Sequence, residues 1–578
     1  MSRRSGTRKC AHRVQSKVLL EKKLCVLCVF QWTGEPWVSV GTMPKRRAAE
    51  SLVKLCLSSV ADNMKEWARD YADNYLDQYS FLYIMGPFNQ LPGSLVQELL
   101  RLLSESHRVS RTYLHLLLVP HLSALSLSGC SSIVSNAVAQ LVGARCQSLT
   151  SLCLRDCKRV QPGVLVDLVE LLPGLRSLDL SGSQCNTQVL SAVGSSCPAL
   201  RELHVSNCRA VTSRGLLHLA FDPTRGCSTH SQLRRLAASN IDSRGGVDSV
   251  GPAAFLLLAL PHLEHLDHSG LVEACTLISR LHFQTIDCFA AKEGFPSLSE
   301  LVHSRAGEGV DGEASPVCLN LRQMSEVEAE LLGTLTPVCG EVVEVSVLCG
   351  EELGSDWGLS LWKTLTHLTV QSTGVHSRPL RDLLLALEVL GPSLRLLTIQ
   401  DFSLDDSLDP ILSLCLNLRV LHCHLQPPAT ALHEDHEADD STWAMELRLL
   451  HFRDFFLGFP PCSPGLTAQT CAGLQGTLAS LLAGAPQVER VSLHGLPFSL
   501  DRVLCKALEG PGAPLCRLQH LSLAHSSVSM GTVLGLMDQG NQLSRLDLSG
   551  CQDIYRRDFD RLESLARERG YDLQITWS

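Results

Sequence analysis

The chain has 578 residues, 45% of them apolar, and a formal net charge of -9, so it is globular rather than disordered, and the negative balance argues against a nucleic-acid-binding protein. Aromatic residues make up only 5%, which favours a core of many similar aliphatic layers, as in a solenoid. The 24 cysteines come without a convincing signal peptide, and we interpret them as reduced thiols.

Residues 1–47 are basic and are predicted to be a disordered extension. Their apolar run from Leu24 to Phe30 is too short to span a bilayer, and Met43 offers a second plausible start. Cys25 and Cys28 form one CxxC pair, but a structural zinc site needs four well-spaced ligands. We therefore predict no metal ion in this segment.

Residues 48–118 are predicted to form a small helical module. No proline or glycine interrupts the helical pattern from residue 48 to about residue 70. This helix carries a short apolar stripe at i, i+4 and i+8, which by itself is typical of an ordinary amphipathic helix buried in its own domain. The stripe and its neighbours are Ser51, Leu52, Leu55, Cys56 and Val60.

A second motif follows a turn at Gly86-Pro87 and reads Leu91-Pro92-x-x-Leu95-x-x-x-Leu99. Proline is tolerated in the first turn of a helix, where its missing N–H costs nothing. The leucines after it then line one helix face. The sequence thus predicts a second amphipathic helix in the same module.

Residues 119–578 repeat themselves with the pattern LxxLxLxx(N/C). The strand leucines Leu125, Leu152, Leu178 and Leu203 are 27, 26 and 25 residues apart. Repeats of this length place a helix on the convex side of a leucine-rich-repeat solenoid, so the predicted fold class is α/β, with parallel strands on the concave face. The residue that ends each strand is interpreted as structural rather than as a reactive thiol in Cys130, Cys157 and Cys208.

Further along, the repeats become less regular and then regular again. We expect insertions in the middle, about fifteen turns in total, and a C-terminal cap made of a helix at 556–569 and a strand at 573–577. The expected strands after the first four contain Leu236, Leu266, Leu301, Val345, Leu368, Leu397, Leu421, Leu450, Val491, Leu521 and Leu546.

No catalytic or nucleotide-binding motif is found in the sequence. The acidic segment His433–Asp440 is interpreted as a solvated loop rather than a metal site. We therefore predict a protein that is not an enzyme and that uses no cofactor or metal, with an unknown protein substrate and no nucleic-acid or membrane partner. The concave positions predicted to contact that substrate are Arg155, Asp179, His204, Arg235 and Asp267.

The first motif resembles the BC box, (S/T/A/P)LxxxCxxx(V/I/L/A), through which substrate receptors of ubiquitin ligases bind Elongin C. In that family the leucine fills an apolar pocket on Elongin C and the cysteine packs beside it, which implies these roles for Leu52 and Cys56. The second motif resembles a cullin box of the von Hippel-Lindau type, which selects cullin-2. The type that selects cullin-5 usually has a second proline, and here that position is Ser94.

The order of the two boxes ahead of a leucine-rich-repeat solenoid is similar to the Zyg-11 and PRAME-like receptors. The resemblance implies a substrate-recognition subunit of a cullin-RING ubiquitin ligase, bound to Elongin C, Elongin B and cullin-2, in the cytoplasm or the nucleus. No armadillo-type C-terminal region like that of the Zyg-11 relatives is evident.

Two alternatives stay open at this point. The LPxxLxxxLL stretch also resembles the start of an F-box, which would imply the Skp adaptor instead of Elongin C. The chain could instead be a leucine-rich scaffold whose helical module only caps the solenoid. Exposure of Leu52, Cys56 and Val60 would indicate a missing partner, whereas their complete burial would favour the scaffold.

Overall fold

Most of the helical module and most of the solenoid lie within the part of the chain that can be described. The predicted extension 1–47 and the acidic segment His433–Asp440 lie outside it. The computed structural model describes residues 51–75, 87–229, 232–241, 249–281, 283, 294–306, 317–350, 362–374, 376–404, 407–427, 448–460, 466–510 and 515–578.

The N-terminal module consists of helices packed against the start of the solenoid. The single helix predicted from residue 48 to about residue 70 is two helices, because the chain leaves helical geometry at Asn63. The Asn63 side chain donates a hydrogen bond to the Ser59 carbonyl oxygen over 2.7 Å and so caps the first of them. The helices of the module are α2 (Leu52–Asp62), α3 (Met64–Tyr75), α4 (Gly93–Glu105) and α5 (Arg111–Leu117).

The first half of the solenoid is a parallel six-stranded sheet, in the order β1-β2-β3-β4-β7-β8. The central leucine of each strand points into the core and is buried, as in Leu125, Leu152 and Leu178. The strands are β1 (Ala124–Ser126), β2 (Ser151–Cys153), β3 (Ser177–Asp179), β4 (Glu202–His204), β7 (Arg235–Ala237) and β8 (His265–Asp267), and the helical segments that follow them are η2 (Ser128–Ile133), α6 (Asn136–Arg145), α7 (Pro162–Glu170), α8 (Thr187–Ser196), η3 (Arg214–Leu219), α9 (Val250–Ala259) and α10 (Leu271–Arg280).

The strand predicted at Leu301 is wrong, because the chain forms helix α12 (Leu298–Ala306) there. Ser297 and Glu300 make a reciprocal capping box: the Ser297 N–H donates to the Glu300 carboxylate at 2.8 Å, and the Glu300 N–H donates to the Ser297 hydroxyl at 3.2 Å. Helix α12 packs on α9 in the outer layer. A short hairpin, β5 (Phe221–Asp222) and β6 (Cys227–Ser228), projects from the same region.

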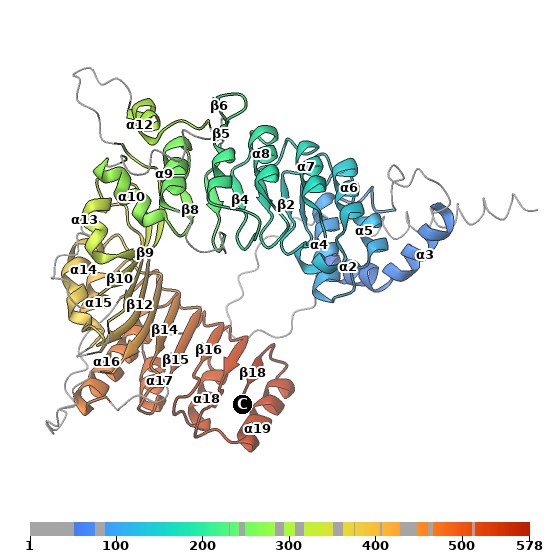
Figure 1. The fold of residues 1–578 in the computed structure, drawn as a ribbon. Helices are drawn as coiled ribbons and strands as arrows, with labels where there is room; N and C mark the ends of the chain where they lie inside the picture. Colours follow the sequence, from blue (N-terminus) through green and yellow to red (C-terminus); the bar gives the residue numbers. More distant parts are fainter. Residues whose placement is uncertain are drawn as a thin grey trace, which may run out of the picture.

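The second half is a parallel ten-stranded sheet whose strands follow chain order from β9 to β18. Figure 1 shows the two sheets as successive arms of one open arc, with strands on the inner side, helices on the outer side, and the N-terminal module and C-terminal cap at the two ends. The strands are β9 (Gln323–Glu328), β10 (Glu344–Cys349), β11 (His367–Ser372), β12 (Leu396–Ser403), β13 (Val420–Gln426), β14 (Asp454–Gly458), β15 (Arg490–His494), β16 (His520–Ser522), β17 (Arg545–Asp547) and β18 (Gln574–Thr576). The helical segments are η4 (Ala329–Leu331), α13 (Leu332–Leu335), η6 (Leu380–Leu383), α14 (Leu384–Leu390), α15 (Asp409–Leu414), α16 (Ala468–Gly484), α17 (Asp501–Leu508), α18 (Met530–Asp538) and α19 (Arg556–Glu568).

Two strands in this half differ from the prediction. The strand predicted at Leu450 is wrong: Leu450 is exposed and β14 begins at Asp454. Phenylalanines occupy the leucine positions of this repeat, with Phe452 and Phe455 both buried. Strand β9 was not predicted, because its core position is filled by Met324 rather than leucine. Elsewhere the leucine pattern and the strands agree, and the chain is a leucine-rich-repeat solenoid.

The cysteines at the strand ends are structural, as predicted. The thiols of Cys208 and Cys551 each donate to a backbone carbonyl of the preceding repeat over 3.1 Å. Burial raises the pKa of Cys130 to about 11 and that of Cys157 to about 12, so both stay protonated and unreactive at neutral pH. Among the described residues, no helix is both long and apolar enough to cross a bilayer.

Candidate functional site

The first motif runs along α2, from its N-cap at Ser51 to Val60. Ser51 precedes the helix, and its hydroxyl accepts a hydrogen bond from the Lys54 N–H at 3.2 Å. Such an N-cap satisfies a donor that would otherwise have no partner within the helix. The cap fixes the start of α2 and therefore the direction in which Leu52 and Leu55 project.

The side chains of this motif divide between solvent and the protein core. Leu52 is 60% exposed and Leu55 is 49% exposed. Cys56 and Val60 are half-buried, and Val60 packs against the core. The stripe is therefore neither fully accessible nor fully covered: its N-terminal end is open and its C-terminal end belongs to the module. Val53, 46% exposed, extends the open end, giving three apolar side chains within four consecutive residues at the surface.

The opposite face of α2 holds the module together. Leu57, on that face, is buried, as is Met64 at the start of α3, and α2 packs on α4. The rings of Trp67 and Phe88 meet at 5.8 Å. An ion pair between Arg108 and Asp62 (2.6 Å) joins the end of α2 to the loop after α4. Within the described residues, α2 is thus held to the module through its buried face and its C-terminal end.

The second motif is mostly internal. Leu91 and Leu99 are buried, Leu95 is partly buried against the same core, and only Pro92, directly before α4, is exposed. Helix α4 also holds the first repeat, because the Gln97 side chain donates to the Ala124 carbonyl oxygen of β1 at 2.7 Å. In this conformation Leu91 and Leu99 stabilise the module and are not available to a cullin.

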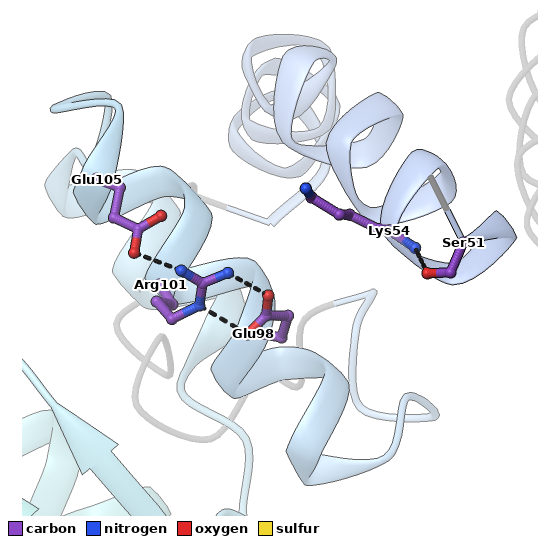
Figure 2. A network of polar contacts seen from close by, with 5 residues as sticks. All are labelled: Ser51, Lys54, Glu98, Arg101 and Glu105. Carbon is purple, nitrogen blue, oxygen red and sulfur yellow. Dashed lines mark hydrogen bonds and ion pairs between the residues drawn. The ribbon is translucent and has the colours of Figure 1, made fainter. Parts of the chain in front are cut away.

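A row of charged side chains borders the exposed turn. Arg101 on α4 binds both Glu98 and Glu105, and Figure 2 shows this row beside the start of α2 with Lys54. The hydrogen bond from Arg101 lowers the pKa of Glu98 below its usual range, and the two carboxylates raise the pKa of Arg101. Glu98 and Arg101 are therefore both ionised at neutral pH. An apolar centre with a charged margin is the composition of a protein-protein interface.

Four of the five residues predicted to contact a substrate lie in strands of the first sheet, and the fifth follows one of its strands. The strand register places Asp179 opposite His204, and Asp267 follows in the same row beyond Ala237. Arg235 belongs to the adjacent row and lies 3.9 Å from Glu202. Arg155 follows β2 and is exposed beside Asp156. The structure thus collects these residues on one surface of mixed charge.

Sequence reasoning missed an aromatic cluster on the second sheet. The Phe456 ring lies 4.3 Å from the ring of His424 and 5.0 Å from that of His494, measured between centroids. Gly458 makes room for it, since a Cβ there would lie 2.9 Å from two Phe456 ring carbons. Burial lowers the pKa of both histidines, which keeps them neutral at pH 7. The sequence feature that could have revealed this cluster is the Phe-Phe-Leu-Gly run. It lies in the repeat whose strand was predicted at the wrong position.

Comparison with known proteins gives a distant sequence relative. DNA repair protein RAD7 of Saccharomyces cerevisiae is 25% identical over 197 residues, a stretch that spans 33% of each chain. The match thus covers about a third of the length of RAD7. No protein-family model matches the chain.

Solved structures of similar chains have low overall superposition scores. The yeast complex of Rad7 and Elc1 gives a TM-score of 0.36 with 16% identity, covering 67% of this chain and 97% of the solved chain. The complex of TLR13 with ssRNA13 gives 0.34 with 14% identity, covering 71% and 54%. The leucine-rich repeat-containing protein LegL7 of Legionella pneumophila gives 0.28 with 15% identity, covering 51% and 88%.

Proposed function

We propose that this protein is a substrate-recognition subunit of an Elongin BC cullin-RING ubiquitin ligase, and that it performs no covalent step itself. The start of α2 binds Elongin C, which brings Elongin B and cullin-2, while the solenoid holds a target protein for ubiquitin transfer. Such a receptor acts in the cytoplasm or the nucleus. The observation that carries the proposal is the exposed apolar turn made of Leu52, Val53 and Leu55, in the sequence context of a BC box.

Two further features support the docking role. The turn is already helical, with the Ser51 cap at its start and α4 packed on α2, so a partner would bind a preformed surface and less conformational entropy would be lost than for an unfolded segment. Rad7, part of which is similar in sequence to this chain, forms a complex with Elc1 in yeast. By analogy, a small adaptor protein is a reasonable occupant of the turn here.

The proposal is tested by replacing the two most exposed leucines of the turn. Leu52→Ala with Leu55→Ala removes apolar surface that a partner would bury, and we expect Elongin C and Elongin B to disappear from pull-downs. The matched control is Leu385→Ala with Val389→Ala, which removes similar surface from α14, where the two side chains are 54% and 59% exposed. If the α2 variant, the α14 control and the parent protein all recover the same amount of Elongin C and Elongin B, the proposal is ruled out.

The choice of adaptor and cullin is decided in the same pull-downs. Recovery of the Skp adaptor in place of Elongin C would assign the protein to the F-box receptors. Recovery of cullin-5 in place of cullin-2 would assign the second motif to the type of cullin box that selects cullin-5. Because Leu91 and Leu99 are buried, we propose that cullin contact uses the exposed side of α4, including Arg101 and Glu105.

One observation favours a second candidate function. Helix α4 buries Leu99 and Leu103 completely and is bonded to β1 through Gln97, as expected of a cap that covers the open end of a solenoid. A scaffold without ligase attachment would need only this cap. The scaffold alternative predicts that no Elongin, Skp or cullin subunit is recovered with the parent protein. The receptor proposal predicts that Elongin C is recovered.

A further inference from the structure

Three arginines occupy the same position in consecutive repeats of the second sheet. Arg395, Arg419 and Arg453 lie one residue before β12, β13 and β14, which are side by side in the sheet (Figure 1). Their backbones form a ladder, in which the Arg419 N–H donates to the Arg395 carbonyl at 2.7 Å and the Arg453 N–H donates to the Arg419 carbonyl at 2.8 Å. All three are exposed. With strands about 4.8 Å apart, the row spans about 10 Å of the sheet edge.

Two exposed leucines accompany this row. Leu416 is 55% exposed and Leu450 is 61% exposed, and each lies three residues before one of the arginines. A single exposed leucine needs no explanation, but here two of them take equivalent positions in neighbouring repeats beside aligned charges. We call this surface the basic edge; it consists of Arg395, Leu416, Arg419, Leu450 and Arg453.

The charges of the basic edge are not neutralised within the described part of the chain, where none of its three arginines has an ion pair with a carboxylate. Other arginines of the solenoid do have one. Arg234, which also lies one residue before a strand, pairs with Glu264 in the next repeat at 3.0 Å, and Arg490 pairs with Asp454 at 2.8 Å. In the next repeat the equivalent position is occupied by Glu489, whose carboxylate forms no ion pair with Arg453 in the described part of the chain.

We infer that the basic edge binds a short acidic segment of a target protein that also carries leucine-like apolar side chains. Guanidinium groups bind carboxylates through paired hydrogen bonds, and Leu416 and Leu450 supply the apolar contact. A nucleic acid fits less well, because its phosphate backbone offers nothing to the leucines and the chain as a whole carries a net charge of -9. The inference depends on the proposed function in one respect, that the solenoid binds a target protein. It does not depend on binding of the ligase subunits.

The dimensions of the row limit the length of the segment. An extended peptide rises about 3.3 Å per residue and places alternate side chains on one face about 6.6 Å apart. A stretch of roughly four residues therefore spans the three arginines, with two carboxylates facing the sheet. Long arginine side chains accommodate the difference between the strand spacing and the peptide repeat.

The test measures fluorescence anisotropy with the full-length protein and labelled peptides of about twelve residues. The first probe alternates glutamate with serine over its central four residues and carries leucines on both sides of that stretch; the second has glutamine for every glutamate, and the third has serine for every leucine. We expect the first probe to bind roughly tenfold tighter than either of the others, and its binding to weaken as salt is raised.

Two charge-reversal variants locate the binding surface. Combining Arg395→Glu, Arg419→Glu and Arg453→Glu is expected to abolish binding of the first probe. The control, Arg176→Glu with Arg201→Glu, reverses charges at the same position of the first sheet, where Arg201 N–H also donates to the Arg176 carbonyl at 2.8 Å. There the positions of the exposed leucines are taken by prolines, Pro173 and Pro198.

A milder variant covers the case in which the triple reversal does not fold, as judged by circular dichroism. Leu416→Ser with Leu450→Ser should reduce binding of the first probe to that of the serine probe. Equal binding of the three probes, unchanged binding in both basic-edge variants, or tighter binding of a single-stranded RNA of equal charge would each overturn the inference. Leu52→Ala with Leu55→Ala should keep peptide binding, so failure of the ligase arm is seen separately.

Discussion

Replacing Leu99 by alanine separates the structural role of the second motif from a docking role. Leu99 is fully buried, and its helix α4 packs on α2 and on η2 of the first repeat. Truncation of a fully buried leucine costs about 2–5 kcal/mol, because the transfer free energy is lost and a cavity remains. Leu52, at 60% exposure, should cost less than about 0.5 kcal/mol when truncated.

Hydrogen exchange measured by mass spectrometry is suited to this comparison, since a solenoid opens locally rather than all at once. A loss of 2 kcal/mol, the lower limit, speeds exchange of the α4 amides about 30-fold. We expect that acceleration in Leu99→Ala but not in Leu52→Ala. Peptides from β15 to β18 serve as an internal reference, because they belong to the opposite end of the arc.

The opposite pattern would refute the reasoning. If Leu99→Ala exchanges like the parent protein but loses cullin-2, then Leu99 contacts the cullin directly and α4 must move away from the core when it binds. If Leu52→Ala accelerates exchange as much as Leu99→Ala, then the start of α2 belongs to the core and the exposed turn is not a docking surface.

Three further predictions concern other parts of the solenoid. Ser297→Ala removes half of the capping box of α12 and should destabilise that helix by about 1 kcal/mol, seen as faster exchange confined to α12. Burial lowers the pKa of His115 to about 4, so only the unfolded chain gains a proton there between pH 6.5 and 4; stability to urea should fall across that range, and His115→Gln should make the fall shallower. Gly458→Ala places a methyl group against the Phe456 ring and should displace it, which a changed ring-current shift of the neighbouring histidine protons in NMR spectra would report.

The regular repeats were predictable because their core positions are filled by leucine at nearly constant spacing. Where another apolar side chain takes the place of leucine, the leucine pattern no longer identifies the strand. Phe455 and Met324 occupy core positions of β14 and β9, so the prediction misplaced β14 and missed β9. The strand predicted at Leu301 failed for a different reason, since the Ser297 capping box starts a helix there. Apolar spacing alone does not distinguish the two over so short a run.

The candidate site was predictable only in part. Spacing along a helix identified Leu52, Cys56 and Val60 as one stripe, but it does not determine which end of the stripe another element covers. That depends on the packing of α4 against α2, a tertiary contact with no local signal. The basic edge was equally hidden, because its arginines are 24 and 34 residues apart in sequence and become neighbours only through the strand register.

The joint between the two sheets has a consequence for how the protein is made. Strands β8 and β9 are separated by α12 and more than fifty residues of chain, and the Arg322 N–H meets the Glu264 carbonyl across the joint at 2.8 Å. During synthesis on the ribosome, the first sheet and its helical cap can therefore fold before the second sheet has been translated. We expect the emerging chain to pass through a stable half-solenoid, to which later repeats add one at a time from β9 onward.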